Sequence, residues 1–102
     1  MRVIKIGAIW CGGCLIMNKV WNKLKKSYEF EYEEFDLDMD SDAVQRFNPG
    51  DKLPVFIILD GNSEVDRFVG EYSYDELFNK LKGVGVINEE SNYFSNGIKY
   101  LD

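Results

Sequence analysis

The sequence of 102 residues has no histidine, and its only two cysteines are Cys11 and Cys14. A closed zinc site takes four cysteine or histidine ligands, so this chain has too few of these side chains to complete one. A metal at the cysteines would need a second chain that shares the ion, or an outside thiol that completes an iron–sulfur cluster. Two inert buried cysteines are a further alternative, and a reversible dithiol is the favoured interpretation.

Positive charge and long apolar runs are also scarce. The chain has 12 Lys and Arg against 18 Asp and Glu, a net charge of −6, which disfavours nucleic acid or an anionic membrane as the main partner. The longest apolar run, Val55 to Leu59, is much shorter than a membrane span. Lys5 interrupts the first apolar run and no signal-peptide cleavage pattern follows it, so we expect a cytoplasmic protein in a reducing compartment. We also expect it to be a monomer.

The apolar residues change their period along the chain, and the changes predict the order of the strands. Residues 3–10 and 53–60 are apolar at nearly every position, which is typical of inner strands covered on both faces. Residues 28–38 alternate acidic with apolar side chains, as a third strand would. After a turn at 60–63, residues 64–69 are predicted to return as an antiparallel strand.

Three helices are predicted between and after these strands. The first begins in the turn of the cysteines and has an apolar stripe of Ile16, Met17, Val20, Trp21 and Leu24. A short helix at 42–47 has Ser41 as its expected cap, and a capping box at 73–76 opens a helix that runs to Lys82. This order predicts an α/β fold with a four-stranded mixed sheet and helices on both faces.

Residues 1–83 are predicted to form this domain, because Gly83 is placed to end the last helix. Residues 84–102 form a C-terminal extension in which aromatic residues flank the turn signal Asn96-Gly97. The extension is therefore either a small hairpin or a tail that packs its aromatic side chains on the domain.

The position of the cysteines gives them different expected roles. Cys11 lies where a strand meets the first turn of a helix, so the free N–H groups of Gly13 and Cys14 should point at its sulfur. Such a position favours a thiolate over a thiol. Cys14 lies one turn further along, within reach of a disulfide formed at Cys11, and the two glycines between them let a partner's backbone come close. We expect Cys11 to be the nucleophile and Cys14 the resolving cysteine.

The chain resembles the thioredoxin family in three places: Trp10-Cys11-Gly12-Gly13-Cys14, Leu53-Pro54 and Gly70. The resemblance covers residues 3–82 and implies a thioredoxin-like fold. It further implies a cis proline that faces the disulfide, and a preceding residue whose backbone binds substrate peptide. The implied substrate groove consists of Trp10, Gly12, Gly13, Leu53, Pro54 and Gly70. The chain departs from thioredoxin in its Gly-Gly dipeptide and in its start, which is short as in glutaredoxins.

The resemblance implies an enzyme that reduces protein disulfides through its dithiol and needs no bound cofactor or metal. Its electrons would come from a protein of the thioredoxin-reductase type. A glutathione-coupled enzyme similar to glutaredoxin is an alternative, with Lys52 as a candidate to hold a glutathione carboxylate. A non-catalytic dimer that binds a metal or an iron–sulfur cluster is an alternative from another functional class.

Lys5 is the one charged residue inside an otherwise apolar strand. At this position thioredoxin has a buried aspartate that is thought to handle the proton of the resolving cysteine, and its companion lysine corresponds to Glu34 here. The resemblance therefore implies a charge-reversed buried pair, Lys5 and Glu34, in which one member relays protons. In the alternative, Lys5 extends its amine to the sheet edge and Glu34 belongs to a solvated acidic strand.

Overall fold

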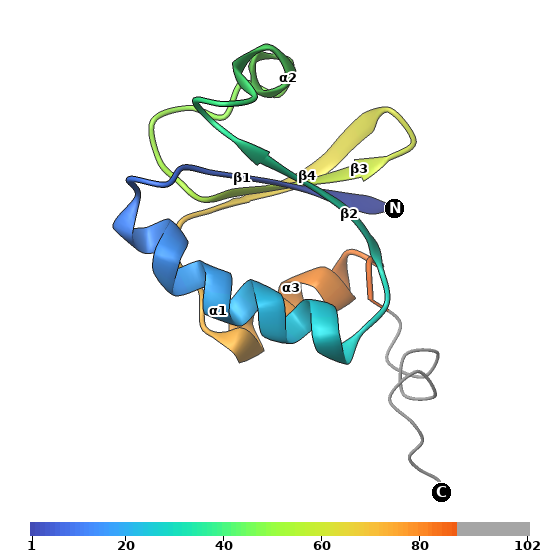
Figure 1. The fold of residues 1–102 in the computed structure, drawn as a ribbon. Coiled ribbons are helices and arrows are strands. Elements are labelled where there is room, and N and C mark those ends of the chain that lie inside the picture. The colour runs from blue at the N-terminus through green and yellow to red at the C-terminus, as the bar shows by residue number, and fades with distance from the viewer. Residues whose placement is uncertain (88–102) are drawn as a thin grey trace, which may run out of the picture.

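The computed structural model describes residues 1–87, which form one mixed sheet flanked by helices (Figure 1). The elements in chain order are β1 (Arg2–Gly7), α1 (Gly12–Ser27), β2 (Glu31–Asp36), α2 (Ser41–Gln45), β3 (Val55–Asp60), β4 (Ser63–Val69) and α3 (Tyr74–Gly83). The four strands lie in the order β2-β1-β3-β4. β1 is parallel to β2 and antiparallel to β3, and β4 is antiparallel to β3. The predicted α/β fold is confirmed.

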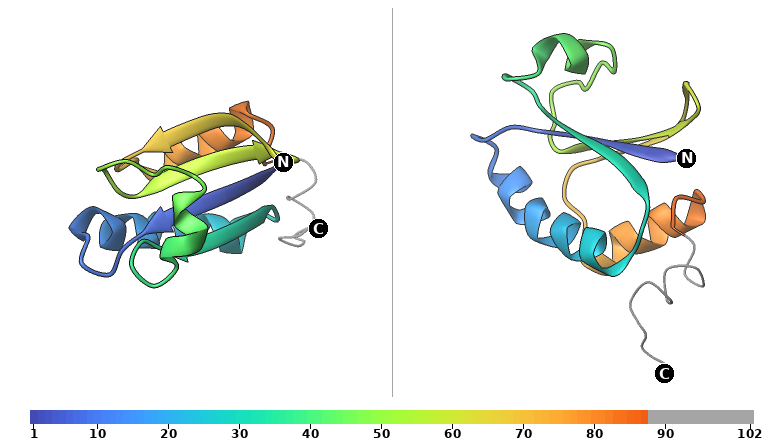
Figure 2. Two further views of the ribbon diagram at one scale, coloured as in Figure 1. Left: turned by 90° about the horizontal axis from the view of Figure 1, so that it is seen from above. Right: turned by 45° about the vertical axis from the view of Figure 1, so that its right-hand side comes forward.

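The helices cover both faces of the sheet, as predicted. α1 and α3 lie together on one face and α2 lies on the other, which Figures 1 and 2 show from three sides. Successive side chains of a strand point to opposite faces. In β1, Val3 therefore packs with the α1 side, whereas Ile4 and Ile6 pack with Val44 of α2. Lys5 shares the face of Val3 and so points toward α1.

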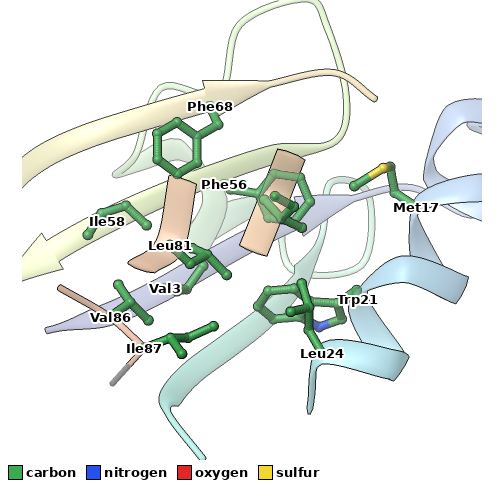
Figure 3. Packing of buried hydrophobic residues seen from close by; sticks show 11 residues of the cluster. Val3, Met17, Trp21, Leu24, Phe56, Ile58, Phe68, Leu81, Val86 and Ile87 are labelled. Carbon is green, nitrogen blue, oxygen red and sulfur yellow. The ribbon is translucent and has the colours of Figure 1, made fainter. Parts of the chain in front are cut away.

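The larger core lies between the sheet and the pair α1 and α3 (Figure 3). Trp21 of α1 is its largest fully buried side chain, and its ring lies 5.5–5.6 Å from those of Phe30, Tyr32 and Phe56. Each large apolar side chain that is fully buried stabilises the fold by about 1.5–3 kcal/mol. This core fixes α1 against the sheet, and α1 carries both cysteines.

Several boundaries differ from the sequence-based expectation: β2 is shorter than the expected strand at 28–38, β3 begins at Val55 instead of residue 53, and α2 ends at Gln45 instead of residue 47. β1 ends at Gly7 instead of Trp10, because the chain turns after Gly7: the Cys11 N–H donates to the Ala8 carbonyl. Residues 9 and 10 are consequently exposed. Ser41 is not the cap of α2; Asp40 is, and its side chain makes no capping hydrogen bond.

The apolar stripe of α1 is also shorter than predicted. Met17, Trp21 and Leu24 are fully buried, but Ile16 is 57% exposed. Ile16 lies in the second turn from the N-terminus of α1, beside an equally exposed Leu15. Helical periodicity identifies a stripe, but it does not show where the neighbouring sheet ends.

The last helix and the segment after it form the remaining part of this layer. Ser73 and Glu76 form the predicted capping box at the start of α3. After α3, Val86 and Ile87 are buried in the larger core. Residues 88–102, including the hairpin considered around Asn96-Gly97, lie outside the described residues. Within residues 1–87, no helix has the length and apolar character required to cross a membrane.

Candidate active site

Cys11 and Cys14 lie at the N-terminus of α1, and both are free thiols. Cys11 is the N-cap residue, and its sulfur accepts a hydrogen bond from the Cys14 N–H over 3.1 Å. The sequence predicted that the N–H groups of Gly13 and Cys14 point at the Cys11 sulfur, and the Cys14 N–H makes this hydrogen bond. Cys11 is partly exposed and Cys14 is buried, so an incoming disulfide reaches Cys11 first. The backbone N–H and the positive end of the helix dipole both favour negative charge on the Cys11 sulfur.

A second segment closes one side of Cys11. The Cys11 thiol donates a weak hydrogen bond to the Leu53 carbonyl over 3.8 Å, and the Leu53–Pro54 peptide bond is cis, as the resemblance implies. The Pro54 carbonyl accepts a hydrogen bond from the Gly70 N–H over 2.9 Å. Gly70 has a φ of +98°, which a side chain would strain. The fold thus brings Leu53, Pro54 and Gly70 to the cysteine turn.

Trp10 lies on the open side of the turn and is 66% exposed. Its indole N–H donates to an Asp38 carboxylate oxygen over 2.7 Å, so the loop after β2 holds the ring. Sequence analysis missed Asp38, because nothing in the local pattern ties it to a residue 28 positions earlier.

Gly7 provides the space behind Cys14. A Cβ atom at this position would lie 3.3 Å from the Cys14 sulfur and 4.0 Å from the Lys5 amine nitrogen. The sulfur and the amine therefore approach the same point beside the Gly7 backbone. A glycine within a buried strand was the available signal for such a close approach.

Lys5 is held by α1 and not by β2. It is only 7% exposed, and its amine donates to the Asn18 side-chain oxygen over 2.9 Å. Burial lowers the pKa of Lys5, against the opposing influence of the Glu34 and Cys14 charges. Asn18 follows Cys14 by four residues and so lies on the same face of the helix, a spacing from which it could have been identified.

The expected direct pair of Lys5 and Glu34 is not formed. The two residues are opposite each other in the register of β1 and β2, but the Glu34 carboxylate pairs with the Lys25 amine at 2.8 Å. Partial burial alone would raise the pKa of Glu34, yet the hydrogen bond from Lys25, the Trp21 indole and the two lysine charges keep it below its ordinary value. Glu34 therefore acts on Lys5 through charge across the strands. The alternative of Lys5 at the sheet edge is also excluded by its burial.

The pKa of Cys14 is raised to about 11, first by burial and then by the hydrogen bond and the charge of Cys11. A backbone hydrogen bond of Ala8 and the charge of Lys5 act in the opposite direction. Two of the causes that raise this pKa come from Cys11. Both causes would end if the Cys11 sulfur were bound in a disulfide with another molecule, and the Cys14 thiol would then be easier to deprotonate.

A cavity of about 390 Å³ lies next to Cys14. Lys5, Cys14, Asn18 and Glu34 line it, together with Asp36 and Asp40. Its wall thus brings the Cys14 thiol and the buried Lys5 amine to one cavity. In the described part of the chain, no group of three or more Cys, Asp or Glu side chains is arranged to hold a metal ion.

The comparisons with known proteins identify the family of the chain. The family model named Thioredoxin matches residues 1–83. The chain belongs to the thioredoxin family. The matched residues include the whole sheet, the three helices and every residue of the candidate site.

Individual thioredoxins are similar to the chain over most of its length. A thioredoxin H-type protein of Fagopyrum esculentum is 31% identical over 80 residues, which are 78% of this chain and 67% of that protein. The crystal structure of a thioredoxin from Nicotiana alata is 34% identical and has a TM-score of 0.72, covering 80% of this chain and 70% of that one. Fasciola hepatica thioredoxin is 29% identical, with a TM-score of 0.67 and coverages of 80% and 78%.

Proposed function

We propose that this protein reduces disulfide bonds of other proteins, with Cys11 as nucleophile and Cys14 as resolving cysteine. The observation that carries the proposal is the placement of Cys11. Its sulfur is partly exposed, accepts the Cys14 N–H, and lies 3.8 Å from the Leu53 carbonyl, beside a cis proline. The membership of the thioredoxin family supports the same chemistry.

The reaction has two exchanges of sulfur partners. The Cys11 thiolate attacks one sulfur of the substrate disulfide, and the other substrate sulfur leaves as a thiolate and takes a proton. Cys14 then loses its proton and attacks the Cys11 sulfur. The second substrate sulfur leaves, and a Cys11–Cys14 disulfide remains. Two electrons have passed from the dithiol to the substrate.

Lys5 is proposed to receive the proton of Cys14. The amine and the thiol lie on the same cavity wall and approach the same point beside Gly7. Burial lowers the pKa of Lys5, so a larger fraction of its amine is neutral, and able to accept a proton, than in an exposed lysine. The ammonium formed then stabilises the Cys14 thiolate and can release its proton to solvent in the cavity. Glu34 supports the ammonium only through its charge.

The substrate is proposed to bind in the groove formed by Trp10, Gly12, Gly13, Leu53, Pro54 and Gly70. The exposed ring of Trp10 offers apolar area, and the Leu53 backbone offers hydrogen bonds to an extended peptide. The electron donor would be a protein of the thioredoxin-reductase type. The enzyme would act as a monomer in the cytoplasm, without a bound cofactor.

A redox titration tests the proposal. The protein is equilibrated in dithiol buffers of graded potential and followed by thiol counting and by tryptophan fluorescence, since Trp10 lies next to Cys11. A reversible two-electron transition below about −230 mV is expected of a disulfide reductant. A much less reducing value would indicate an oxidising or glutathione-coupled role. Failure to form an intramolecular disulfide would refute the proposal, and metal analysis of reduced protein would then test the metal-binding alternative.

A further inference from the structure

The Glu71 carboxylate lies against the cysteine turn, a contact that no sequence pattern predicts. A Cβ atom at Gly13 would lie only 2.9 Å from the Glu71 carboxylate oxygen. Gly13 is the second residue of α1 and lies between the two cysteines. Glu71 follows Gly70, whose N–H is bound to the groove residue Pro54. The carboxylate therefore occupies the rim of the groove, over the dipeptide that separates Cys11 from Cys14.

Glu71 has no protein cation to neutralise it within residues 1–87. It is exposed and makes neither a hydrogen bond nor an ion pair in this part of the chain. The first turn of α1 contains no acidic residue of its own, so the positive end of this helix attracts the Glu71 carboxylate. The site of exchange thus carries a negative charge that remains available to an incoming substrate.

Asp38 provides a second carboxylate next to the cysteine turn. The Asp38 carboxylate accepts the indole N–H of Trp10, the residue before Cys11. The Glu71 carboxylate lies beside Gly13, two residues after Cys11, so a carboxylate lies near the chain on each side of Cys11 in the sequence. The one basic residue next to a groove position in sequence is Lys52, which precedes Leu53. Apolar side chains near the turn are also exposed by more than half: Ile9, Trp10, Leu15, Ile16 and Met39.

We propose that the protein acts preferentially on disulfides flanked by lysine or arginine within an apolar segment, and that Glu71 is the specificity-determining residue. This inference rests on the proposed reductase function. A basic side chain beside the substrate cysteine meets the free carboxylate, whereas an acidic one is repelled, as charge complementarity requires. The exposed apolar side chains accept the remaining part of such a segment.

The same contact gives position 13 a reason to be glycine. Any side chain there would begin 2.9 Å from the Glu71 carboxylate oxygen and displace it from the turn. The position of the Glu71 carboxylate at the turn therefore depends on glycine at position 13. Replacing Gly13 should reduce the preference even though Glu71 is retained.

Disulfide-linked peptides test the charge preference in single turnover with prereduced protein. Three peptides differ only in the residues on either side of the cysteine, which are lysine, glutamine or glutamate. Each rate constant is divided by that of dithiothreitol with the same peptide, which removes differences in intrinsic reactivity. We expect the lysine peptide to react about three- to tenfold faster than the glutamate peptide after this correction, and the ratio to approach one in high salt.

Variants show which residue sets the ratio. Glu71→Gln should bring it close to one and Glu71→Lys should invert it. Asp60→Lys is the matched control, because it makes the same charge change at the opposite end of β3 and should retain the wild-type ratio. A corrected ratio of one in the wild type, or a ratio that survives Glu71→Lys, would overturn the inference while leaving reductase activity in place. Absence of reduction with every peptide would instead refute the proposed function itself, and the inference with it.

If Glu71 only stabilised the start of α1, its replacement would lower the melting temperature and leave the ratio unchanged. Melting curves of Glu71→Gln and wild type, recorded beside the kinetics, separate the two roles. A stability loss without a change of ratio overturns the specificity role.

Discussion

Replacing Lys5 with methionine should slow the second exchange of sulfur partners and leave the first nearly intact. The Cys14 sulfur and the Lys5 amine lie within 3.3 and 4.0 Å of one point beside Gly7, so they are at most about 7 Å apart. At an effective dielectric constant of about 20, an ammonium at that distance stabilises a thiolate by about 2 kcal/mol. Lys5→Met removes this stabilisation and also the proposed proton acceptor.

The expected rate follows from this energy. A loss of about 2 kcal/mol lowers the Cys14 thiolate fraction at pH 7 by about thirtyfold. A thiolate of higher pKa is intrinsically more nucleophilic, with a Brønsted coefficient of about 0.4–0.5, and this recovers about fivefold. The second exchange should therefore be about five- to tenfold slower. Loss of proton transfer would slow it further.

Stopped-flow spectroscopy with a symmetrical aromatic disulfide resolves the two exchanges. Attack by Cys11 releases the first coloured thiol and attack by Cys14 releases the second, so each step has its own phase. Lys19→Met is the matched control, since it removes an exposed cation from the same helix. An unchanged second phase in Lys5→Met, or an equal slowing in Lys19→Met, would refute the role of Lys5.

Three further outcomes are expected. Gly7→Ala should slow the second exchange and lower the free energy of unfolding by about 1–3 kcal/mol, because the added Cβ would lie 3.3 Å from the Cys14 sulfur. Gly83→Ala is the control, because a Cβ there would have no atom within 4 Å. Equal behaviour of the two variants in urea unfolding and stopped flow would contradict the packing argument. Arg67→Met should lower the free energy of unfolding by about 1–3 kcal/mol, because the Arg67 guanidinium binds the Phe47 and Asn48 carbonyls at 2.6 Å as well as Glu64; an unchanged urea midpoint would show that these bonds are dispensable. Folding lowers the pKa of Lys5, so burial of the charged amine destabilises the protein in full at a pH below the folded pKa, and this cost disappears above the ordinary pKa of 10.5. The stability difference between Lys5→Met and wild type should therefore shrink as the pH rises through that window. A difference that does not depend on pH would count against burial of a charged amine.

The order of elements and the place of Cys11 at the start of α1 could be predicted from the sequence, because both depend on neighbours along the chain. Changes in apolar period separate strands from helices, and the spacing of Ser73 and Glu76 predicts a capping box that the structure contains. Cys11 at the junction of strand and helix is an N-cap for the same local reason. The predicted end of β1 and the predicted burial of Ile16 were wrong, because both depend on how far the sheet extends beneath α1.

The charged groups around the cysteines are brought together by tertiary packing. Strand pairing places Lys5 opposite Glu34, but the path of α1 across the sheet brings Asn18 to the Lys5 amine and Lys25 to Glu34. The contact of Glu71 with Gly13 likewise joins segments 58 positions apart in the numbering. Local patterns determine which face a side chain occupies. Which residue a side chain contacts on that face depends on how separate helices and strands pack against each other. That packing is set jointly by all the side chains of the core.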